Sequence, residues 1–356
     1  MGFQFMKILF ILQFDSFIKT LLPVYDQLYK KHFDLELVLF KHWRKKNWIS
    51  NEITKLLNNY PYAIYGRRKI LDKLNGGYNV VIVGTTGGII TRVYNYRQKN
   101  KLKFKIVTGY VGALLNNNQR SFILGVKKRS QSDLIWVPGK SAAIKILDTQ
   151  LVDTEKTIIV NTGLPRFDEL FHLSKYWYNN CRNLILFIEQ PTYPKTYKER
   201  KKLVFRLIKI AESYPKHTLI IKPRFREKIG HAHKPKHLLP EILKKIANKP
   251  NNIISSNSDL YSLFPNTDFA LTISSTGGLE SLLVNIPTYF INDFCKKTNL
   301  YGSEYFKVLG AVTNTQNIIN KDTPKINFNY AHDLLLFNGN STQNFVNAII
   351  KLVKSE

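Results

Sequence analysis

Short apolar runs alternate with longer amphipathic segments along most of this 356-residue chain. This alternation is typical of a parallel sheet whose strands are joined by helices that cover it. The predicted strands of the first half are Lys7–Leu12, Leu35–Phe40, Val80–Val83, Lys105–Val107, Leu134–Val137 and Ile158–Val160. Those of the second half are Leu184–Ile188, Thr218–Ile221, Asn252–Ile254, Phe269–Ile273 and Thr288–Ile291. The longer segments, such as Glu199–Ser213 and Pro240–Ala247, are predicted helices, so the fold class is α/β.

The series of strands is interrupted once, between Val160 and Leu184, where the chain is polar and rich in Tyr and Asn. A chain of this length suffices for two domains of ordinary size. We therefore expect two doubly wound, Rossmann-like domains, residues 1–175 and 176–340, and a closing helix in residues 341–356. Ligands of open α/β sheets bind outside the carboxyl ends of the strands, so we expect a central cleft between the domains.

Polar loops directly follow six of the predicted strands. They are Gln13–Lys19 (QFDSFIK), Gly84–Gly88 (GTTGG), Thr108–Gly112 (TGYVG), Glu189–Tyr193 (EQPTY), Lys222–Arg226 (KPRFR) and Ser274–Gly278 (SSTGG). The carboxyl ends of parallel strands meet at one edge of a sheet. Six polar loops at such ends are therefore stronger evidence for a functional site at this edge than any single loop.

The last of these loops is a candidate phosphate site. It is predicted to join a buried strand to a helix, and a helix start directs N–H groups and a positive partial charge at one point. Its hydroxyls can donate to a ligand, and its glycines let a ligand approach the backbone. These residues are Ser274, Ser275, Thr276, Gly277 and Gly278. Glu280, on the first helical turn, is placed to reach a ribose or sugar hydroxyl, whereas the alternative interpretation is a plain helix cap.

Cationic side chains follow the strand Thr218–Ile221. Lys222 and Arg224 flank a proline there, and arginine suits a phosphate or carboxylate through paired hydrogen bonds. A solvated surface pair is the alternative. His231 and His233 lie nearby without a carboxylate cluster, which favours one histidine contact to a phosphate over a metal site. No loop offers an evident carboxylate pair for a metal, so we expect no metal requirement.

The chain is strongly basic, with 53 Lys and Arg against 25 Asp and Glu. This imbalance favours an anionic partner, whether nucleic acid, anionic lipid or a charged sugar or phosphate. Basic and aromatic residues interleave in Lys41–Trp48 (KHWRKKNW), Tyr65–Lys69 and Tyr94–Lys105. Such segments suit an anionic membrane surface, and equally an acidic polysaccharide or RNA. General lysine enrichment is the alternative explanation.

Several protein classes are disfavoured by the sequence. Two cysteines are too few for a disulfide framework, and no apolar run approaches the roughly 20 residues that span a bilayer. There is neither a GxGxxG fingerprint nor a Walker A loop, which disfavours NAD and ATP. The apolar start is interrupted by Gln13 and Asp15 and is predicted to be a core strand instead of a signal peptide. We expect a cytoplasmic protein, in solution or peripheral on the inner face of the plasma membrane.

An ordered set of motifs resembles the GT-B glycosyltransferases, and among them a bacterial family similar to sialyltransferases and associated with sialic-acid-type and capsular sugars. The set comprises Asp15-Ser16 with Lys19, GLPRFD at Gly163–Asp168, KPR at Lys222–Arg224, the histidines His231 and His233, SST…LES at Ser274–Ser281, and Asp293-Phe294. The resemblance implies metal-independent, inverting transfer of a sialic-acid-like nonulosonate from a CMP-activated donor to a surface glycan or glycolipid, with no bound cofactor. Within GLPRFD we expect an ion pair between Arg166 and Asp168.

The resemblance also implies roles for individual residues. Ser274, Ser275 and Thr276, with Arg224, would hold the donor phosphate, and Asp15 would accept the proton of the acceptor. Capping of the first helix is the alternative for Asp15. Glu189 is a second candidate base, a ligand contact or a hinge contact. The sequence departs from the pattern because KPRFR stands where a His-Pro motif is expected, so Arg224, His231 or His233 would take over that contact.

Three other functions fit the same residues. One is a CDP-glycerol-type polyol phosphotransferase, and another is a GT-B transferase that uses a UDP-sugar. The third, from a different class, is a protein with a degenerate GT-B fold that binds anionic lipid or nucleic acid. The glycosyltransferase interpretation makes nucleic acid the less expected partner.

Overall fold

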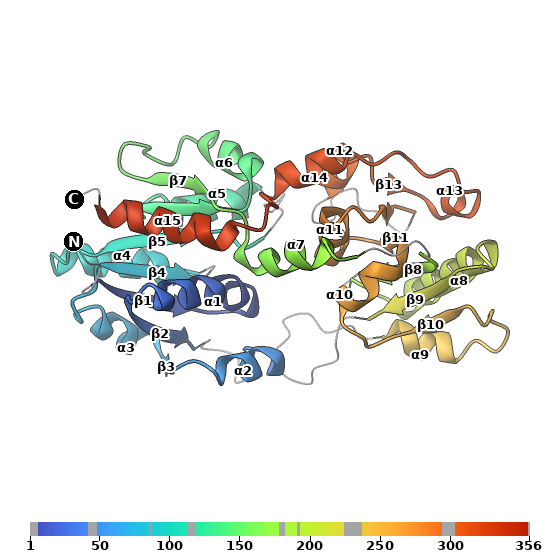
Figure 1. Ribbon diagram of the computed structural model, residues 1–356, viewed down its shortest axis with the longest axis horizontal. Helices are drawn as coiled ribbons and strands as arrows, with labels where there is room; N and C mark the ends of the chain where they lie inside the picture. The colour runs from blue at the N-terminus through green and yellow to red at the C-terminus, as the bar shows by residue number, and fades with distance from the viewer. Residues whose placement is uncertain are drawn as a thin grey trace. The chain divides into compact units, whose positions relative to one another are not determined.

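A computed structural model describes residues 6–41, 48–85, 87–112, 119–177, 182–190, 193–223, 237–293 and 303–354 (Figure 1). They form two compact units. The chain leaves the first unit after Glu169, earlier than the expected residue 175, and returns to it at Asp333, earlier than the expected residue 340. The C-terminal helix therefore belongs to the first unit.

The first unit contains a parallel sheet of seven strands in the order β3-β2-β1-β4-β5-β6-β7. The strands are β1 (Lys7–Leu12), β2 (Asp34–Phe40), β3 (Tyr62–Tyr65), β4 (Val80–Gly84), β5 (Lys105–Gly109), β6 (Leu134–Val137) and β7 (Ile158–Asn161). The helices are α1 (Asp15–Lys30), α2 (Asn51–Leu57), α3 (Arg67–Lys73), α4 (Ile89–Lys99), α5 (Gln119–Arg129), α6 (Lys140–Leu147), the 3-10 turn η1 (Pro165–Phe167) and α15 (Ser341–Lys354). The chain passes from the first unit to the second within α7 (Asp168–Ser174). The edge strand β3 was not predicted.

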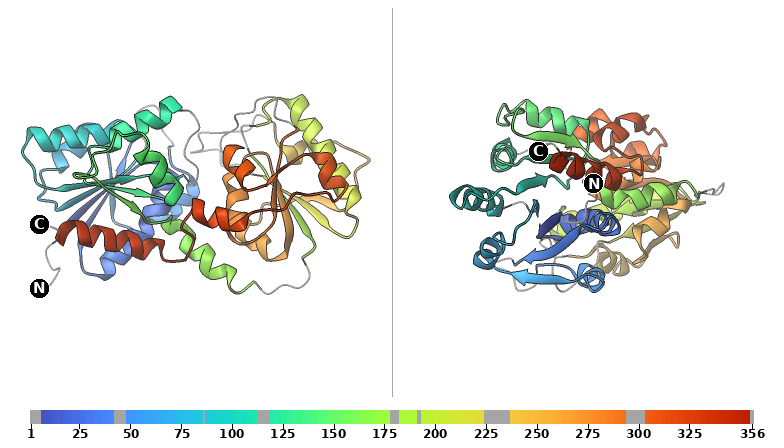
Figure 2. Two further views of the ribbon diagram at one scale, coloured as in Figure 1. Left: turned by 90° about the horizontal axis from the view of Figure 1, so that it is seen from above. Right: turned by 60° about the vertical axis from the view of Figure 1, so that its left-hand side comes forward.

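Helices cover both faces of this sheet (Figure 2). Successive side chains of a strand point to opposite faces. In β1, Phe10 packs in the core that includes α1 and α15, whereas its neighbours Leu9 and Ile11 pack with α3 and α4. A strand buried on both faces must be apolar throughout, which explains the run KILFIL.

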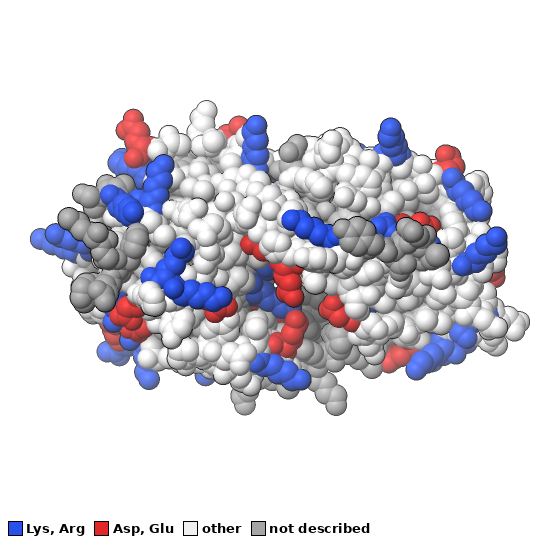
Figure 3. Space-filling model, in the orientation of Figure 1, with Lys and Arg blue, Asp and Glu red and all other residues white. Residues whose placement is uncertain are grey.

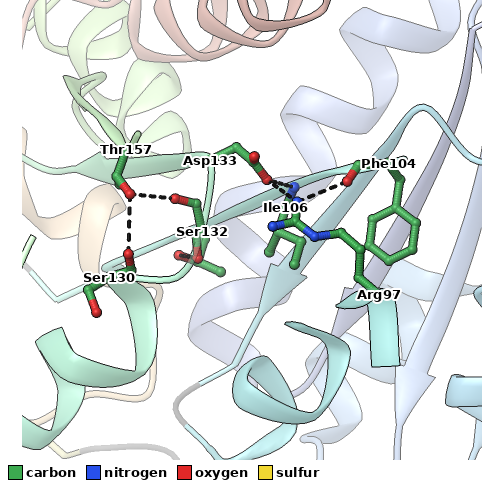
Figure 4. Close-up of polar contacts among 8 residues, drawn as sticks. Arg97, Phe104, Ile106, Ser130, Ser132, Asp133 and Thr157 are labelled. Atoms are coloured by element: carbon green, nitrogen blue, oxygen red, sulfur yellow. Dashed lines mark hydrogen bonds and ion pairs between the residues drawn. The ribbon is translucent and has the colours of Figure 1, made fainter. Parts of the chain in front are cut away.

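Polar contacts join the amino-terminal ends of β5, β6 and β7 (Figure 4). Asp133, immediately before β6, forms a 2.5 Å ion pair with Arg97 of α4 and accepts a 2.6 Å hydrogen bond from the backbone N–H of Ile106. Arg97 also donates to the carbonyl of Phe104. The Thr157 hydroxyl contacts the carbonyls of Ser130 and Ser132. These contacts hold α4 and the strand starts in register.

The second unit contains a parallel sheet of six strands in the order β10-β9-β8-β11-β12-β13. The strands are β8 (Leu184–Ile188), β9 (Thr218–Lys222), β10 (Ile253–Ser255), β11 (Thr267–Thr272), β12 (Thr288–Ile291) and β13 (Val312–Thr313). The helices are α8 (Tyr197–Ser213), α9 (Leu239–Lys244), α10 (Leu260–Leu263), the 3-10 turn η2 (Phe264–Asn266), α11 (Thr276–Leu283), α12 (Ser303–Val308), α13 (Thr315–Ile319) and α14 (Phe328–Leu334). The two-residue strand β13 was not predicted.

The motif GLPRFD attaches α15 to the first unit. Asp168 accepts hydrogen bonds from the backbone N–H groups of Ser341 and Thr342, at 2.9 and 2.7 Å, and so caps the start of α15. Gly163 has a φ of +76°, and a Cβ atom there would lie 2.4 Å from the Ser341 hydroxyl. The predicted ion pair between Arg166 and Asp168 is wrong, because Asp168 binds α15 and the Arg166 guanidinium lies 4.5 Å from the centre of the Phe167 ring.

Within the described residues, no helix is both long enough and apolar enough to cross a membrane.

Replacing Asp133 with alanine should destabilise the first unit. The change leaves the partly buried Arg97 and the Ile106 N–H without their acceptor, which costs about 1–3 kcal/mol of unfolding free energy. Urea unfolding followed by circular dichroism measures the change. The matched control is Asp153→Ala, which removes an exposed ion pair with Lys156 and should leave stability unaltered. Equal effects of the two substitutions would contradict the assigned role of Asp133.

Candidate functional site

The turn between β11 and α11 is fixed to the sheet by one hydroxyl. Thr272 donates from Oγ1 to the carbonyl of Ile188, the last residue of β8, at 2.8 Å. The same oxygen accepts a 3.1 Å hydrogen bond from the backbone N–H of Ser275. Thr272 thereby sets where α11 begins relative to the carboxyl end of the neighbouring strand.

The hydroxyls of the turn have different environments. Ser275 is the N-cap of α11, and its Oγ accepts from the Gly277 N–H at 3.3 Å. The capping alternative therefore holds for this residue. Ser274 is buried, whereas Thr276 is exposed at the first position of the helix. Of the three, the Thr276 hydroxyl is the most open to a ligand.

The two glycines allow α11 to pack closely on the sheet. A Cβ atom on Gly278 would lie 2.7 Å from Cγ2 of Thr272, and one on Gly277 would lie 3.0 Å from Cγ2 of Ile188. Both residues are buried. Protein atoms thus fill the space beside the two glycines, where we expected from the sequence that a ligand would approach the backbone.

Charged side chains lie at the carboxyl ends of β8, which is next to β11, and of β9, which is next to β8. Lys222 ends β9 and is 8% exposed, and its Nζ donates to the carbonyl of Pro223 at 3.2 Å. Burial lowers the pKa of Lys222, while the charges of Asp259 and Glu189 act in the opposite direction. Because β9, β8 and β11 are adjacent, the structure brings Lys222, Glu189 and the turn to one edge of the sheet.

Glu189 is engaged in a buried ion pair. The carboxylate is 3% exposed and contacts Arg200 at 2.5 Å. Arg200 also donates to the carbonyls of Pro194 and Gln190, so the pair organises the loop after β8. All of these contacts lie within the second unit, and the roles expected for Glu189 as a base, a ligand contact or a hinge contact stay predictions.

Glu280 of α11 faces α10, where the Tyr261 hydroxyl donates to its carboxylate at 3.2 Å. Tyr261 also packs against Phe264, which in turn contacts Trp177. The predicted residues Arg224, His231 and His233 lie outside the described part of the chain.

Asp15 lies in the first unit, at the carboxyl end of β1. It is the first residue of α1 and is half-buried. The N-cap position is Phe14, and no side chain caps the helix there, so the capping alternative is wrong. Asp15 instead accepts a 3.1 Å hydrogen bond from the backbone N–H of Ser50. Lys19 pairs with Glu52 at 2.6 Å.

A buried arginine organises two of the predicted polar loops, and sequence reasoning missed it. Arg129 is 3% exposed and donates to the carbonyls of Gly109, Gly125 and Thr85. Its guanidinium lies 4.3 Å from the centre of the Tyr110 ring, and burial lowers its pKa. In the sequence it follows two lysines at a helix end, which gave no signal of burial.

The sequence matches, over residues 8–349, the family described as "Putative glycosyltransferase (DUF6716)". The chain belongs to this family. A comparison with curated proteins found no match.

Solved structures share the fold at low sequence identity. The UDP-GlcNAc 2-epimerase from Neisseria meningitidis, bound to UDP-GlcNAc, has a TM-score of 0.63 and 13% identity, with 97% of this chain and 100% of that chain covered. The UDP-GlcNAc 2-epimerase from Methanocaldococcus jannaschii has a TM-score of 0.65 and 17% identity, with the same coverage. The wall teichoic acid polymerase TagF, H444N with CDPG, has a TM-score of 0.57 and 13% identity, with 98% and 89% covered. The predicted fold class, two Rossmann-like domains of GT-B type, is confirmed.

Replacing Gly278 with alanine should displace α11 from the sheet. The new methyl group would clash with the β-branched Thr272, and we expect a loss of about 1–3 kcal/mol in stability. Thermal unfolding measures the loss. The control is Gly88→Ala, where a Cβ atom would meet nothing within 4 Å. An unaltered midpoint for Gly278→Ala would contradict the close packing.

Proposed function

We propose that this glycosyltransferase takes its sugar from a nucleotide-activated donor whose phosphate binds at the start of α11. The observation that carries this proposal is the grouping of Lys222, the exposed Thr276 and the α11 N-terminus at the carboxyl edge of β9, β8 and β11. A cation and the positive end of a helix stabilise the negative charge that builds up on a leaving phosphate.

We assign donor recognition to several of the residues predicted from the sequence. Ser274, Ser275 and Thr276, together with Arg224, are the proposed phosphate ligands. Glu280, oriented by the Tyr261 hydroxyl, is the proposed ribose contact. Gly277 contributes by allowing α11 to start close to β8. His233 is the proposed contact to the leaving group.

The proposed reaction is a direct displacement with inversion. The acceptor hydroxyl attacks the anomeric carbon, the bond from that carbon to the phosphate oxygen breaks, and the hydroxyl proton passes to a carboxylate. Asp15 is the preferred base because it is half-buried, whereas the Glu189 carboxylate is already bound by Arg200. The nucleotide leaves with the electrons of the broken bond.

The proposed donor is a CMP-activated sialic-acid-like sugar, transferred to a glycan or glycolipid of a bacterial surface. The resemblance at Ser274-Ser275 supports it. A CDP-glycerol-type phosphotransferase is the second candidate, favoured by the structural likeness to TagF with CDPG. We place the protein in the cytoplasm, peripheral to the inner face of the plasma membrane.

Donor identity can be tested by incubating the protein separately with CMP-sialic acid, CDP-glycerol and UDP-GlcNAc and measuring nucleotide release. We expect the protein to release CMP from CMP-sialic acid and to release no nucleotide from the other two donors. Release from CDP-glycerol alone would replace the proposed reaction by polyol-phosphate transfer. UDP release alone would overturn a cytidine donor.

The role of Asp15 is tested by Asp15→Asn, which keeps an oxygen that can accept from the Ser50 N–H but removes the base. We expect turnover to fall about 100-fold or more while nucleotide affinity stays unaltered. The control on the same helix is Asp26→Asn, at a residue that accepts from the Tyr60 hydroxyl. Comparable losses in both variants would show that Asp15 acts through structure alone.

A further inference from the structure

Positive charge is distributed unequally between the helices that cover the two faces of the first sheet. We define the α3–α6 face as the outer surface of α3, α4, α5 and α6, which cover the side of the sheet opposite α1 and α15. These four helices carry four, three, four and two Lys or Arg, against one carboxylate, Asp72. The helices α1, α2 and α15 together carry five Lys or Arg and three Asp or Glu.

This asymmetry separates two explanations of the net charge. A general enrichment in lysine would affect the helices of both faces alike, whereas the Lys and Arg residues of these described helices gather on one face. The α1 and α15 side shows charges of both signs scattered on a mostly uncharged surface (Figure 3). On the α3–α6 face, Arg97 and Arg129 form the structural contacts described above. Most of the other cations of this face are exposed, including Arg67, Arg68, Arg92, Lys99, Arg120 and Lys127.

The same face also exposes aliphatic side chains. Ile123 and Leu124 of α5 and Ile144 and Leu147 of α6 keep 38–49% of their surface exposed. The two helices are neighbours, because Phe122 and Val126 of α5 share a buried cluster with Ala142 and Ile146 of α6. Each helix therefore presents apolar and cationic residues on the side that faces away from the sheet.

We infer that the α3–α6 face docks on an anionic lipid bilayer, with the aliphatic side chains of α5 and α6 entering the headgroup region and the cations meeting lipid phosphates. Aliphatic residues beside lysine and arginine are typical of surfaces that lie in the membrane interface. Proteins that bind single-stranded nucleic acid stack bases on aromatic rings, and the exposed apolar residues here are aliphatic. The inference rests on the proposed peripheral location, but not on the donor or the base.

Vesicle flotation of the full chain tests the inference. The probes are vesicles of phosphatidylcholine alone and of phosphatidylcholine mixed with phosphatidylglycerol. We expect binding only to the mixed vesicles, weakened by added salt. Absence of binding to the mixed vesicles would overturn the inference.

Two double variants separate the apolar and the cationic contributions. Leu124→Ser with Ile144→Ser should weaken vesicle binding about tenfold, since exposed apolar groups no longer enter the interface. Arg120→Gln with Lys127→Gln should weaken it about 10- to 30-fold. Matched controls in the second unit are Phe205→Ser and Lys201→Gln with Lys202→Gln, all exposed on α8. Equal losses in the controls would contradict a specific face.

Two further readouts distinguish the alternatives. Binding of a labelled single-stranded RNA that is lost in the cationic variant and kept in the aliphatic variant, without vesicle binding, would assign the face to nucleic acid and overturn the inference. Donor hydrolysis in solution should be unaltered in all four variants, so failure of membrane docking and failure of the proposed transferase chemistry give different results.

Discussion

The hydroxyl of Thr272 is the contact on which the candidate donor site depends. It joins β8 to the turn before α11 by donating to Ile188 and accepting from Ser275. Its methyl group occupies the space that a side chain on Gly278 would need. One residue therefore fixes both the position of the helix start and its distance from the sheet. A serine would keep the hydrogen bonds and lose the packing, and a valine would do the reverse.

The sequence predicted the features that depend on local pattern. Strands such as β1 and β11 are buried on both faces, so their apolar runs were recognisable without knowing their neighbours. The edge strands β3 and β13 were missed because β3 is only partly buried and β13 has two residues. Contacts between distant residues were missed for a different reason. Nothing near Asp168 in the sequence indicates that it caps a helix beginning at Ser341.

In the candidate site, too, the positions set by local pattern were predicted, whereas the contacts between distant residues were not. The position of Lys222, Glu189 and the Ser274 turn at adjacent strand ends followed from the rule for parallel sheets. The binding partner of each side chain could not be predicted from this rule. Glu189 pairs with Arg200, and Ser275 caps the start of α11, because buried polar groups need partners within the protein. Burial of Arg129 was equally hidden, since its acceptors are carbonyls of three separate segments.

Carboxylates are scarce in this chain, and several of them hold backbone N–H groups of distant segments. Asp15 binds Ser50, Asp133 binds Ile106, and Asp168 binds the start of α15. Each such bond orients a carboxylate as well as the segment it binds. For Asp15 the structural and the proposed catalytic role are therefore compatible, because a carboxylate has two oxygens and a bond from Ser50 to one of them fixes the direction of the other. An oriented, half-buried carboxylate at the end of β1 is a better base than a freely rotating one, since less motion must be arrested before the proton is transferred.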